Sequence, residues 1–374
     1  MHVYDEIDIP RIINAAGSMT YLGGSLIHPD ILEAMRQAGE AYVFIDDLLD
    51  WASSEITKQT GADAGLVTTG TTGGIILSAA ACLTGMDSER MHQLPNTNGR
   101  ANEFIMQSQH RISFDRAIRT AGGKIVEVGH RECTQIKDVR AAINEKTVAI
   151  FHTILDPQPA VPLKEIVKLA NERAVPVIVD AAAELPPVCN LQSFLSEGAD
   201  LVIFSGGKAM CGPNDTGFLC GRADLIKAAR AQAFPNAGIG RALKVSKEQI
   251  IGLIYALQRF VQIDWNSEQL RWEKVCEKIL HRLKSINCTN ISIAYATHGA
   301  RPLIVPRVCL TIDPIMLGKD LSQIDYQLER GKPAIAVVMD ENKNEIWLNP
   351  QHLHDNQIND MCSRLIAVIG SRKN

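Results

Sequence analysis

The chain has 374 residues, which is enough for two or three domains with a large buried core. Hydrophobic residues make up 46% of it and charged residues 21%, as is typical of a folded globular protein. Its formal net charge of −4 supplies no overall electrostatic attraction for nucleic acids or anionic membranes. The composition therefore argues against both classes of partner.

Signals for secretion, membrane insertion and metal binding are also missing from the sequence. The apolar runs are short or broken by charges, and the first ten residues, MHVYDEIDIP, lack the basic start and apolar core of a signal peptide. The nine cysteines show no CxxC spacing, and their odd number fits free thiols in a reducing compartment. The histidines have no metal-ligand spacing. We therefore expect a cytoplasmic protein without a membrane span or a metal site.

The pattern of apolar and turn residues divides the chain into three parts. Residues 1–55 are predicted to form an N-terminal arm and a helix, because Pro29 opens an amphipathic run. Residues 56–260 alternate short apolar strands with helical segments and form the predicted large domain. Residues 261–374 are expected to form a linking helix and a small C-terminal α+β domain.

The middle part predicts an α/β layer with a mostly parallel sheet, which binds ligands at the carboxyl ends of its strands. The expected strands are 64–69, 103–107, 124–128, 147–152, 175–180 and 200–205, with a return strand at 217–220. Helices such as 74–83 and 163–173 lie between them, and long helical patterns follow from 247 to 285. The expected C-terminal strands are 307–312, 335–340 and 345–348, flanked by two helices.

Two of these strands end in residues that suit pyridoxal 5'-phosphate (PLP). The apolar strand VIVD ends at Asp180, and the next strand runs into Ser-Gly-Gly and then Lys208. An acid in the position of Asp180 would keep the pyridine nitrogen protonated, while the amine of Lys208 would form a Schiff base with the aldehyde. The alternative for Asp180 is a local cap after its strand, and for Lys208 a solvated loop lysine.

A glycine turn between a strand and a helix supplies a third feature, a site for phosphate. The sequence VTTGTTGG precedes the apolar run IILSAAACL and places free backbone N–H groups, with Thr71 and Thr72, at a helix start. It matches neither the Walker A loop nor the dinucleotide fingerprint. Alone, the turn is equally consistent with an ordinary helix N-terminus, but with Asp180 and Lys208 it completes the contacts that PLP requires.

Other candidate residues have weaker signals. Ser205, at the end of its strand, is placed to bind the cofactor phosphate, or else to satisfy local backbone groups. His110 follows a strand, where an imidazole can stack on the pyridine ring or serve a structural role. Arg241, Lys244 and Arg301 are candidates to bind a substrate carboxylate or phosphate, although each is also consistent with surface charge.

Several longer segments resemble a known family. The segments SGGKAMCGPNDTGFLCGRADLI, VIVDAAAELPP, GKIVEVG and TQIKDVRAAINEKTVAIFHT resemble the selenocysteine synthase-like (SelA-like) branch of fold-type-I PLP enzymes. The segments RIINAAGSMTYLGGS, QLPNTNGRANEFIMQSQHRISFDRAIRTAGG and GRALKVSKEQIIGLIYAL are similar to the D-glucosaminate-6-phosphate ammonia-lyase group within that branch. The similarity runs from about residue 8 to 340.

The resemblance implies an aspartate-aminotransferase-like α/β fold with a mixed, mostly parallel sheet and a small domain. It assigns Lys208 as the Schiff-base lysine, Asp180 as the pyridinium partner and His110 as the ring-stacking residue. Thr71, Thr72 and Ser205 would contact the phosphate. Active sites in this fold usually lie at a dimer interface, so the resemblance also implies a homodimer or a higher homo-oligomer.

The implied function is that of a PLP-dependent lyase that eliminates ammonia and water from a β-hydroxy amino acid. D-Glucosaminate 6-phosphate or a similar amino sugar acid would be the substrate, and a 2-oxo acid the product. The alternatives are another reaction on the same scaffold (a selenocysteine synthase-like transferase, a racemase or an aldolase) and a PLP-fold protein that binds a partner without turnover. Bacterial selenocysteine synthase itself matches less well, because it carries an additional N-terminal tRNA-binding domain.

Overall fold

The structure is a computed structural model that describes residues 2–154, 160–295 and 301–370. Its contacts divide the chain into two compact units. The larger unit contains residues 26–262, and the smaller unit combines residues 1–25 with residues 263–374. Residues 26–55, which the sequence assigns to a separate N-terminal part, therefore pack with the large unit, whereas residues 1–25 pack with the C-terminal part.

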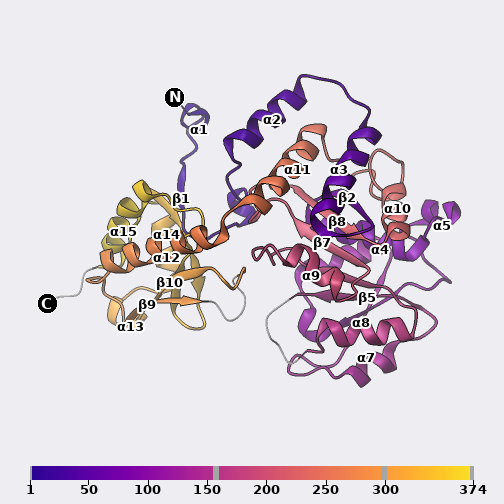
Figure 1. The fold of residues 1–374 in the computed structure, drawn as a ribbon. Coiled ribbons are helices and arrows are strands. Elements are labelled where there is room, and N and C mark those ends of the chain that lie inside the picture. Colours follow the sequence, from indigo (N-terminus) through magenta and orange to yellow (C-terminus); the bar gives the residue numbers. More distant parts are fainter. Residues whose placement is uncertain (1, 155–159, 296–300, 371–374) are drawn as a thin grey trace. The chain divides into compact units, whose positions relative to one another are not determined.

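The large unit is built on a seven-stranded sheet with the order β2-β8-β7-β6-β5-β3-β4 (Figure 1). Strand β8 is antiparallel to both of its neighbours, and all the other pairs are parallel. The strands are β2 (Ala64–Thr69), β3 (Glu103–Gln107), β4 (Lys124–Val128), β5 (Thr147–Thr153), β6 (Val177–Asp180), β7 (Leu201–Ser205) and β8 (Thr216–Gly221). The predicted mixed, mostly parallel sheet is therefore present.

Helices cover both faces of this sheet (Figure 1). On one face, α4, α6 and α10 pack on a core that includes Phe104, Phe151 and Ile203. On the other face, α3, α8, α9 and α11 contact the strands. The helices of the large unit are α2 (Pro29–Gly39), α3 (Ile45–Thr60), α4 (Gly70–Thr84), α5 (Ser88–Gln93), α6 (Arg116–Thr120), α7 (Ile136–Ala142), α8 (Leu163–Glu172), α9 (Asn190–Ser196), α10 (Ala223–Gln232) and α11 (Lys247–Gln262).

The sheet's inner strands have a simple origin in the sequence. Val177, Ile178 and Val179 are all almost completely buried, because neighbouring residues of a strand face opposite sides of the sheet and helices cover both. A strand of this kind is a continuous apolar run rather than an alternating one. Its first polar residue, Asp180, is also the residue at which the strand ends.

The small unit contains a four-stranded antiparallel sheet with the order β12-β13-β10-β9 and a separate parallel pair, β1-β11. Helices α12, α14 and α15 contribute to the core that covers the sheet. Its elements are α1 (Val3–Glu6), β1 (Ile12–Asn14), α12 (Trp265–Arg282), β9 (Asn290–Tyr295), β10 (Pro306–Thr311), α13 (Pro314–Leu317), α14 (Leu321–Glu329), β11 (Ala334–Ala336), β12 (Val338–Asp340), β13 (Glu345–Leu348) and α15 (Asp355–Ile369). The predicted small α+β domain is therefore present.

The structure corrects three details of the predicted elements. The segment 335–340 is not one strand, because it changes partner at Val337: β11 pairs with β1, whereas β12 pairs with β13. Strands β1 and β9 were not expected, since their pairing depends on residues far away in the sequence. Helix α4 begins at Gly70, so Thr71 and Thr72 lie in its first turn rather than in a turn before it.

Candidate functional site

The predicted site residues of the large unit gather where the parallel strands of the sheet end. Strands β2, β3, β5, β6 and β7 all point the same way, so their carboxyl ends share one edge. Asp180 is the last residue of β6, and Ser205 is the last residue of β7. His110 lies in a short 3₁₀ turn (Ser108–His110) directly after β3. Sheets of this type bind ligands at this edge.

Asp180 and Lys208 are close enough to influence each other's ionisation. Asp180 is buried, and its Oδ1 accepts a hydrogen bond of 3.1 Å from the backbone N–H of Ala182. Burial raises the pKa of Asp180 above its usual value, while the hydrogen bond from Ala182 and the charge of Lys208 act in the opposite direction. Burial likewise lowers the pKa of Lys208, against the charges of Asp180 and Glu184. The structure therefore brings the predicted acid and amine together.

The loop that carries Lys208 is folded back on the residues that follow it. The backbone N–H of Gly206 donates to the carbonyl of Thr216 at 2.9 Å, and the N–H of Cys211 donates to the carbonyl of Lys208, also at 2.9 Å. A Cβ atom on Gly207 would lie 2.4 Å from the Cα of Asn214, so a larger residue does not fit there. These contacts hold the backbone of Lys208 in place just past the end of β7.

The beginning of α4 is suited to bind an anion. Thr69, its N-cap residue, makes no side-chain hydrogen bond to the first turn; its hydroxyl instead donates to the carbonyl of Lys244 at 3.3 Å. The first backbone N–H groups of a helix have no partner within it, and the helix dipole adds positive potential there. Thr71 and Thr72 stand in this first turn. The helix start is therefore not capped by its own N-cap side chain.

Close packing places this helix start beside Ser205. Gly217 on β8 is the Cα partner of Ser205 on β7. A Cβ atom on Gly217 would lie 2.6 Å from the carbonyl oxygen of Phe204 and 2.9 Å from the carbonyl carbon of Gly70. The end of β7 and the start of α4 therefore approach each other across a position where no side chain fits.

His110 is buried against a second histidine, His152, which was not among the predicted site residues. The ring centroids of His110 and His152 lie 4.3 Å apart, with their planes at 78° in an edge-to-face arrangement. Burial lowers the pKa of His110 to about 4, and it lowers the pKa of His152 well below the usual value. Both rings are therefore neutral at pH 7.

Two further residues at this edge were also missed. Thr153 is the Cα partner of Asp180 on the neighbouring strand, and its buried hydroxyl has no hydrogen-bond partner among the described residues. Glu184 is buried in the loop after β6 and acts electrostatically on Lys208. The sequence does contain a signal for His152 and Thr153, because these two polar residues end an apolar strand that neighbours the strand of Asp180. Glu184 has no comparable signal.

The predicted substrate-binding cations lie in two different places. Arg241 and Lys244 both approach the ring of Phe234, with Arg241 Cζ 5.1 Å and Lys244 Nζ 5.6 Å from its centroid. Within the part of the chain that the structure describes, neither side chain forms an ion pair. The hydrogen bond between Thr69 and Lys244 keeps this pair near the start of α4. Arg301 belongs to the small unit, so its role at the site stays a prediction.

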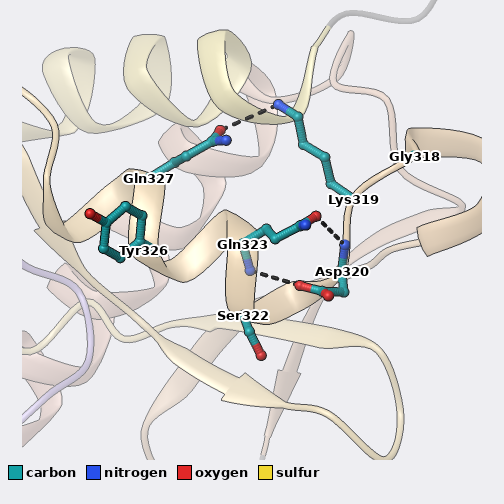
Figure 2. Close-up of a pocket in the computed structure, with 7 residues that line it drawn as sticks. All are labelled: Gly318, Lys319, Asp320, Ser322, Gln323, Tyr326 and Gln327. Carbon is teal, nitrogen blue, oxygen red and sulfur yellow. Dashed lines mark hydrogen bonds between the residues drawn. The ribbon is translucent and has the colours of Figure 1, made fainter.

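The small unit has a surface hollow of about 530 Å³ around the start of α14 (Figure 2). Lys319 Nζ donates to the side chain of Gln327 at 3.3 Å and to the carbonyl of Val368 at 2.9 Å. Asp320 and Gln323 form a reciprocal capping box. Since these polar groups are already paired, through the capping box and through the hydrogen bonds of Lys319, the hollow adds nothing to the candidate site.

Neither a metal cluster nor a membrane-spanning helix is found in the described ranges. No group of three or more His, Cys, Asp or Glu side chains in 2–154, 160–295 and 301–370 is arranged to hold a metal ion. No helix within these residues is both long and apolar enough to cross a membrane.

Comparisons with known proteins connect this geometry to a family. The family model described as "SelA: L-seryl-tRNA selenium transferase" matches residues 12–289. D-Glucosaminate-6-phosphate ammonia lyase of Salmonella typhimurium is 32% identical over 341 residues, which cover 89% of this chain and 88% of that protein. A 5'-C-glycyluridine monooxygenase-decarboxylase of a Streptomyces species is also 32% identical over 341 residues, covering 89% of this chain and 83% of that protein.

Solved structures support the same grouping. A structure of D-glucosaminate-6-phosphate ammonia-lyase has a TM-score of 0.86 and 30% sequence identity, covering 99% of this chain and 98% of that chain. An aspartate aminotransferase of Thermus thermophilus has a TM-score of 0.53 and 16% identity, covering 98% of this chain and 93% of the other. The second match shows the fold alone. The predicted aspartate-aminotransferase-like fold is confirmed.

Proposed function

Because this chain belongs to the SelA family, we propose that it removes ammonia from a β-hydroxy amino acid and releases a 2-oxo acid. Its cofactor is PLP, and it is an enzyme of the carbon–nitrogen lyase type. The observation that carries the proposal is the pairing of the buried Asp180 with the half-buried Lys208 at the carboxyl edge of the sheet. We further propose an amino sugar acid as the substrate, D-glucosaminate 6-phosphate or a close analogue, which is the substrate named for the Salmonella relative.

The residues at the sheet edge fit PLP in three ways. The start of α4 and the neighbouring Ser205 suit a phosphate group. Burial raises the pKa of Asp180, and a more basic carboxylate holds a proton on a pyridine nitrogen more strongly. Burial lowers the pKa of Lys208, which increases the fraction of neutral amine available to attack an aldehyde.

The chain's own residues then have distinct roles in the proposed reaction. When bound, PLP supplies an aldehyde for the substrate amine and an electron-poor ring that accepts the electron pair released at Cα. Lys208 Nζ takes the proton from Cα as general base, which its lowered pKa favours. Asp180 holds the proton on the ring nitrogen. Lys208 can return that proton to the departing β-hydroxyl, which leaves as water, and addition of a water molecule then releases ammonia and the 2-oxo acid.

We propose that Arg241 and Lys244 bind a phosphate or carboxylate of the substrate, with Arg301 as a further candidate. The two side chains meet at Phe234 and have no ion-pair partner among the described residues, so a bound anion would not have to displace one. If they bind a substrate phosphate, the double variant Arg241→Ala/Lys244→Ala should raise KM for a phosphorylated substrate far more than for the unphosphorylated analogue. An equal effect on both substrates would reject this role.

The reaction is tested by incubating the PLP-loaded protein with D- and L-β-hydroxy amino acids, phosphorylated and unphosphorylated amino sugar acids, and analogues without the β-hydroxyl. We expect equal amounts of ammonia and 2-oxo acid from a β-hydroxy substrate and none from the analogue. Lys208→Ala is the control, and it should lose turnover. Exchange of the Cα proton without ammonia release would indicate a racemase instead.

A second reaction is supported by the Streptomyces relative, which is named as a monooxygenase-decarboxylase and shares the same percentage of identical residues. The same pair, Asp180 and Lys208, can hold PLP for loss of a carboxylate group, with O₂ as co-substrate. Oxygen consumption and CO₂ release, measured on the same substrate panel, distinguish this reaction. Ammonia release that is unchanged in the absence of oxygen would exclude it.

We also propose that the chain acts in the cytoplasm, on a small molecule rather than a nucleic acid, and as a homodimer or a higher homo-oligomer. Support for self-association comes from the connection between α2 and α3, where Tyr42 and Phe44 are 102% and 82% exposed. Sedimentation should show at least a dimer, which the double variant Tyr42→Ser/Phe44→Ser weakens. Ile315→Ser, which removes an exposed apolar side chain on α13, serves as the matched control. A monomeric parent chain would reject the proposal.

A further inference from the structure

The contact between His110 and His152 joins two neighbouring strands at the edge where the site residues gather. His110 follows β3, and His152 is the second-last residue of β5, which lies between β3 and β6. The Cα partner of His152 on β6 is Val179, the residue just before Asp180. His152 therefore occupies the position between the predicted ring-stacking residue and the strand that carries the predicted pyridinium partner.

The rings of His110 and His152 are held by each other and not by hydrogen bonds through their Nδ1 atoms. His110 and His152 are 4% and 5% exposed, and Nδ1 of each has no hydrogen-bond partner among the described residues. A buried polar atom without a partner costs free energy, which a phenylalanine or leucine of similar size would avoid. The contact that the two rings do make is an edge-to-face one, at 4.3 Å and 78°. Because an edge-to-face contact has a preferred geometry, it restricts the orientation that each imidazole ring can adopt.

We propose that His152 is a positioning residue, whose ring fixes the orientation of the His110 ring and thereby the surface that His110 offers to a stacked pyridine ring. The inference rests on the proposed function, since His110 acts on a pyridine ring only if PLP binds at this edge. His152 itself need not touch the cofactor. Its effect on cofactor binding must therefore pass through His110.

A double-mutant cycle on cofactor affinity tests this dependence. The apo protein is titrated with PLP, and binding is followed by the visible absorbance and circular dichroism of the bound cofactor. An edge-to-face ring contact is worth enough to change affinity by up to about tenfold, so we expect His152→Leu to weaken PLP binding by about that factor. His110→Leu should weaken it at least as much. In the double variant, His152→Leu should add less than about a twofold loss, because its partner is gone.

Conservative and matched variants separate this role from general destabilisation. His152→Phe keeps the ring and should restore most of the PLP affinity, whereas His152→Asn keeps a polar group without the ring and should not. Ile150→Val removes a methyl group from a buried neighbour on the same face of β5. It should lower the melting temperature slightly and leave PLP affinity unchanged.

Three outcomes would overturn the inference. His152→Leu with the PLP affinity of the parent chain would show that the contact has no effect. Single losses that multiply in the double variant would show that His152 acts independently of His110. If His152→Leu does not fold, equal losses of PLP affinity in His152→Phe and His152→Asn would overturn the inference instead, because the ring would then make no difference. A parent chain that fails to bind PLP would overturn the proposed function first, and that failure appears without any substitution.

Discussion

Gly217 and Ser205 are Cα partners on the antiparallel strands β8 and β7, and the absence of a side chain at 217 lets Gly70 at the start of α4 approach the end of β7. A Cβ atom at position 217 would lie 2.6 Å from a carbonyl oxygen and 2.9 Å from a carbonyl carbon, both in the backbone. Backbone atoms cannot move aside as the end of a flexible side chain can. The relative position of the predicted phosphate contacts therefore depends on this glycine.

Gly217→Ala should push the start of α4 away from Ser205 and weaken PLP binding. Overpacking of a well-packed site costs about 1–3 kcal/mol, which corresponds to a loss of affinity of about 5- to 150-fold if it falls on the site. PLP titration followed by visible absorbance measures the effect. Gly39→Ala is the matched control, because a Cβ atom there meets only the side chain of Glu248, at 3.9 Å. Equal affinities for both variants would contradict the prediction.

Asp180→Asn should leave a folded protein with greatly reduced turnover. The amide oxygen of asparagine can still accept the hydrogen bond from the N–H of Ala182, but the amide cannot hold a proton on a pyridine nitrogen. We expect kcat to fall by more than about a hundredfold, or about 2.7 kcal/mol. Steady-state kinetics with saturating PLP measures this. If kcat stays within about tenfold of the parent value, Asp180 is not the pyridinium partner.

Glu184→Gln should shift the pH dependence of cofactor attachment to lower pH. The negative charge of Glu184 raises the pKa of Lys208, so its removal lowers that pKa further and leaves the amine neutral at a lower pH. The rate at which the apo protein attaches PLP, measured by stopped-flow absorbance across a pH series, should therefore begin to rise earlier. Glu197→Gln, at an exposed position after α9, is the control. A shift to higher pH would contradict the stated electrostatic role.

The buried histidines should make the fold less stable in acid. Burial lowers the pKa of His110 to about 4, below its ordinary value near 6.5. The unfolded chain therefore binds a proton between these values while the folded chain does not, so stability is full above about pH 6.5 and declines as the pH falls toward 4. His152, whose pKa is also lowered, contributes with the same sign. Each such group changes the free energy of unfolding by up to about 1.4 kcal/mol per pH unit.

His110→Phe should reduce this decline. Urea unfolding of the apo protein at pH 7, 6 and 5 gives the free energy of unfolding at each pH. The variant should lose less stability between pH 6 and pH 5 than the parent chain, by up to the slope of one proton, about 1.4 kcal/mol per pH unit. Identical slopes for the two proteins would show that His110 takes up its proton equally in the folded and unfolded chains.

Local patterns were sufficient to predict the elements that position the site. The ends of the strands at Asp180 and Ser205 follow from apolar runs that stop at a polar residue. The helix after the glycine turn follows from the same kind of pattern. A change of strand partner was harder to predict from the sequence. The segment 335–340 has one apolar pattern, although its two halves pair with strands of two different sheets. Nothing within the segment itself marks that change.

The sequence alone predicted PLP as the cofactor and Asp180 and Lys208 as the residues nearest the proposed chemistry, since Asp180 ends one strongly apolar strand and Lys208 follows shortly after the end of the next. Only the tertiary structure decided which other side chains join them. His152 meets His110, Thr153 lies beside Asp180, and Glu184 acts on Lys208. The order of strands and the path of the loops create these neighbours, and both depend on packing between residues far apart in the chain, which no local pattern encodes.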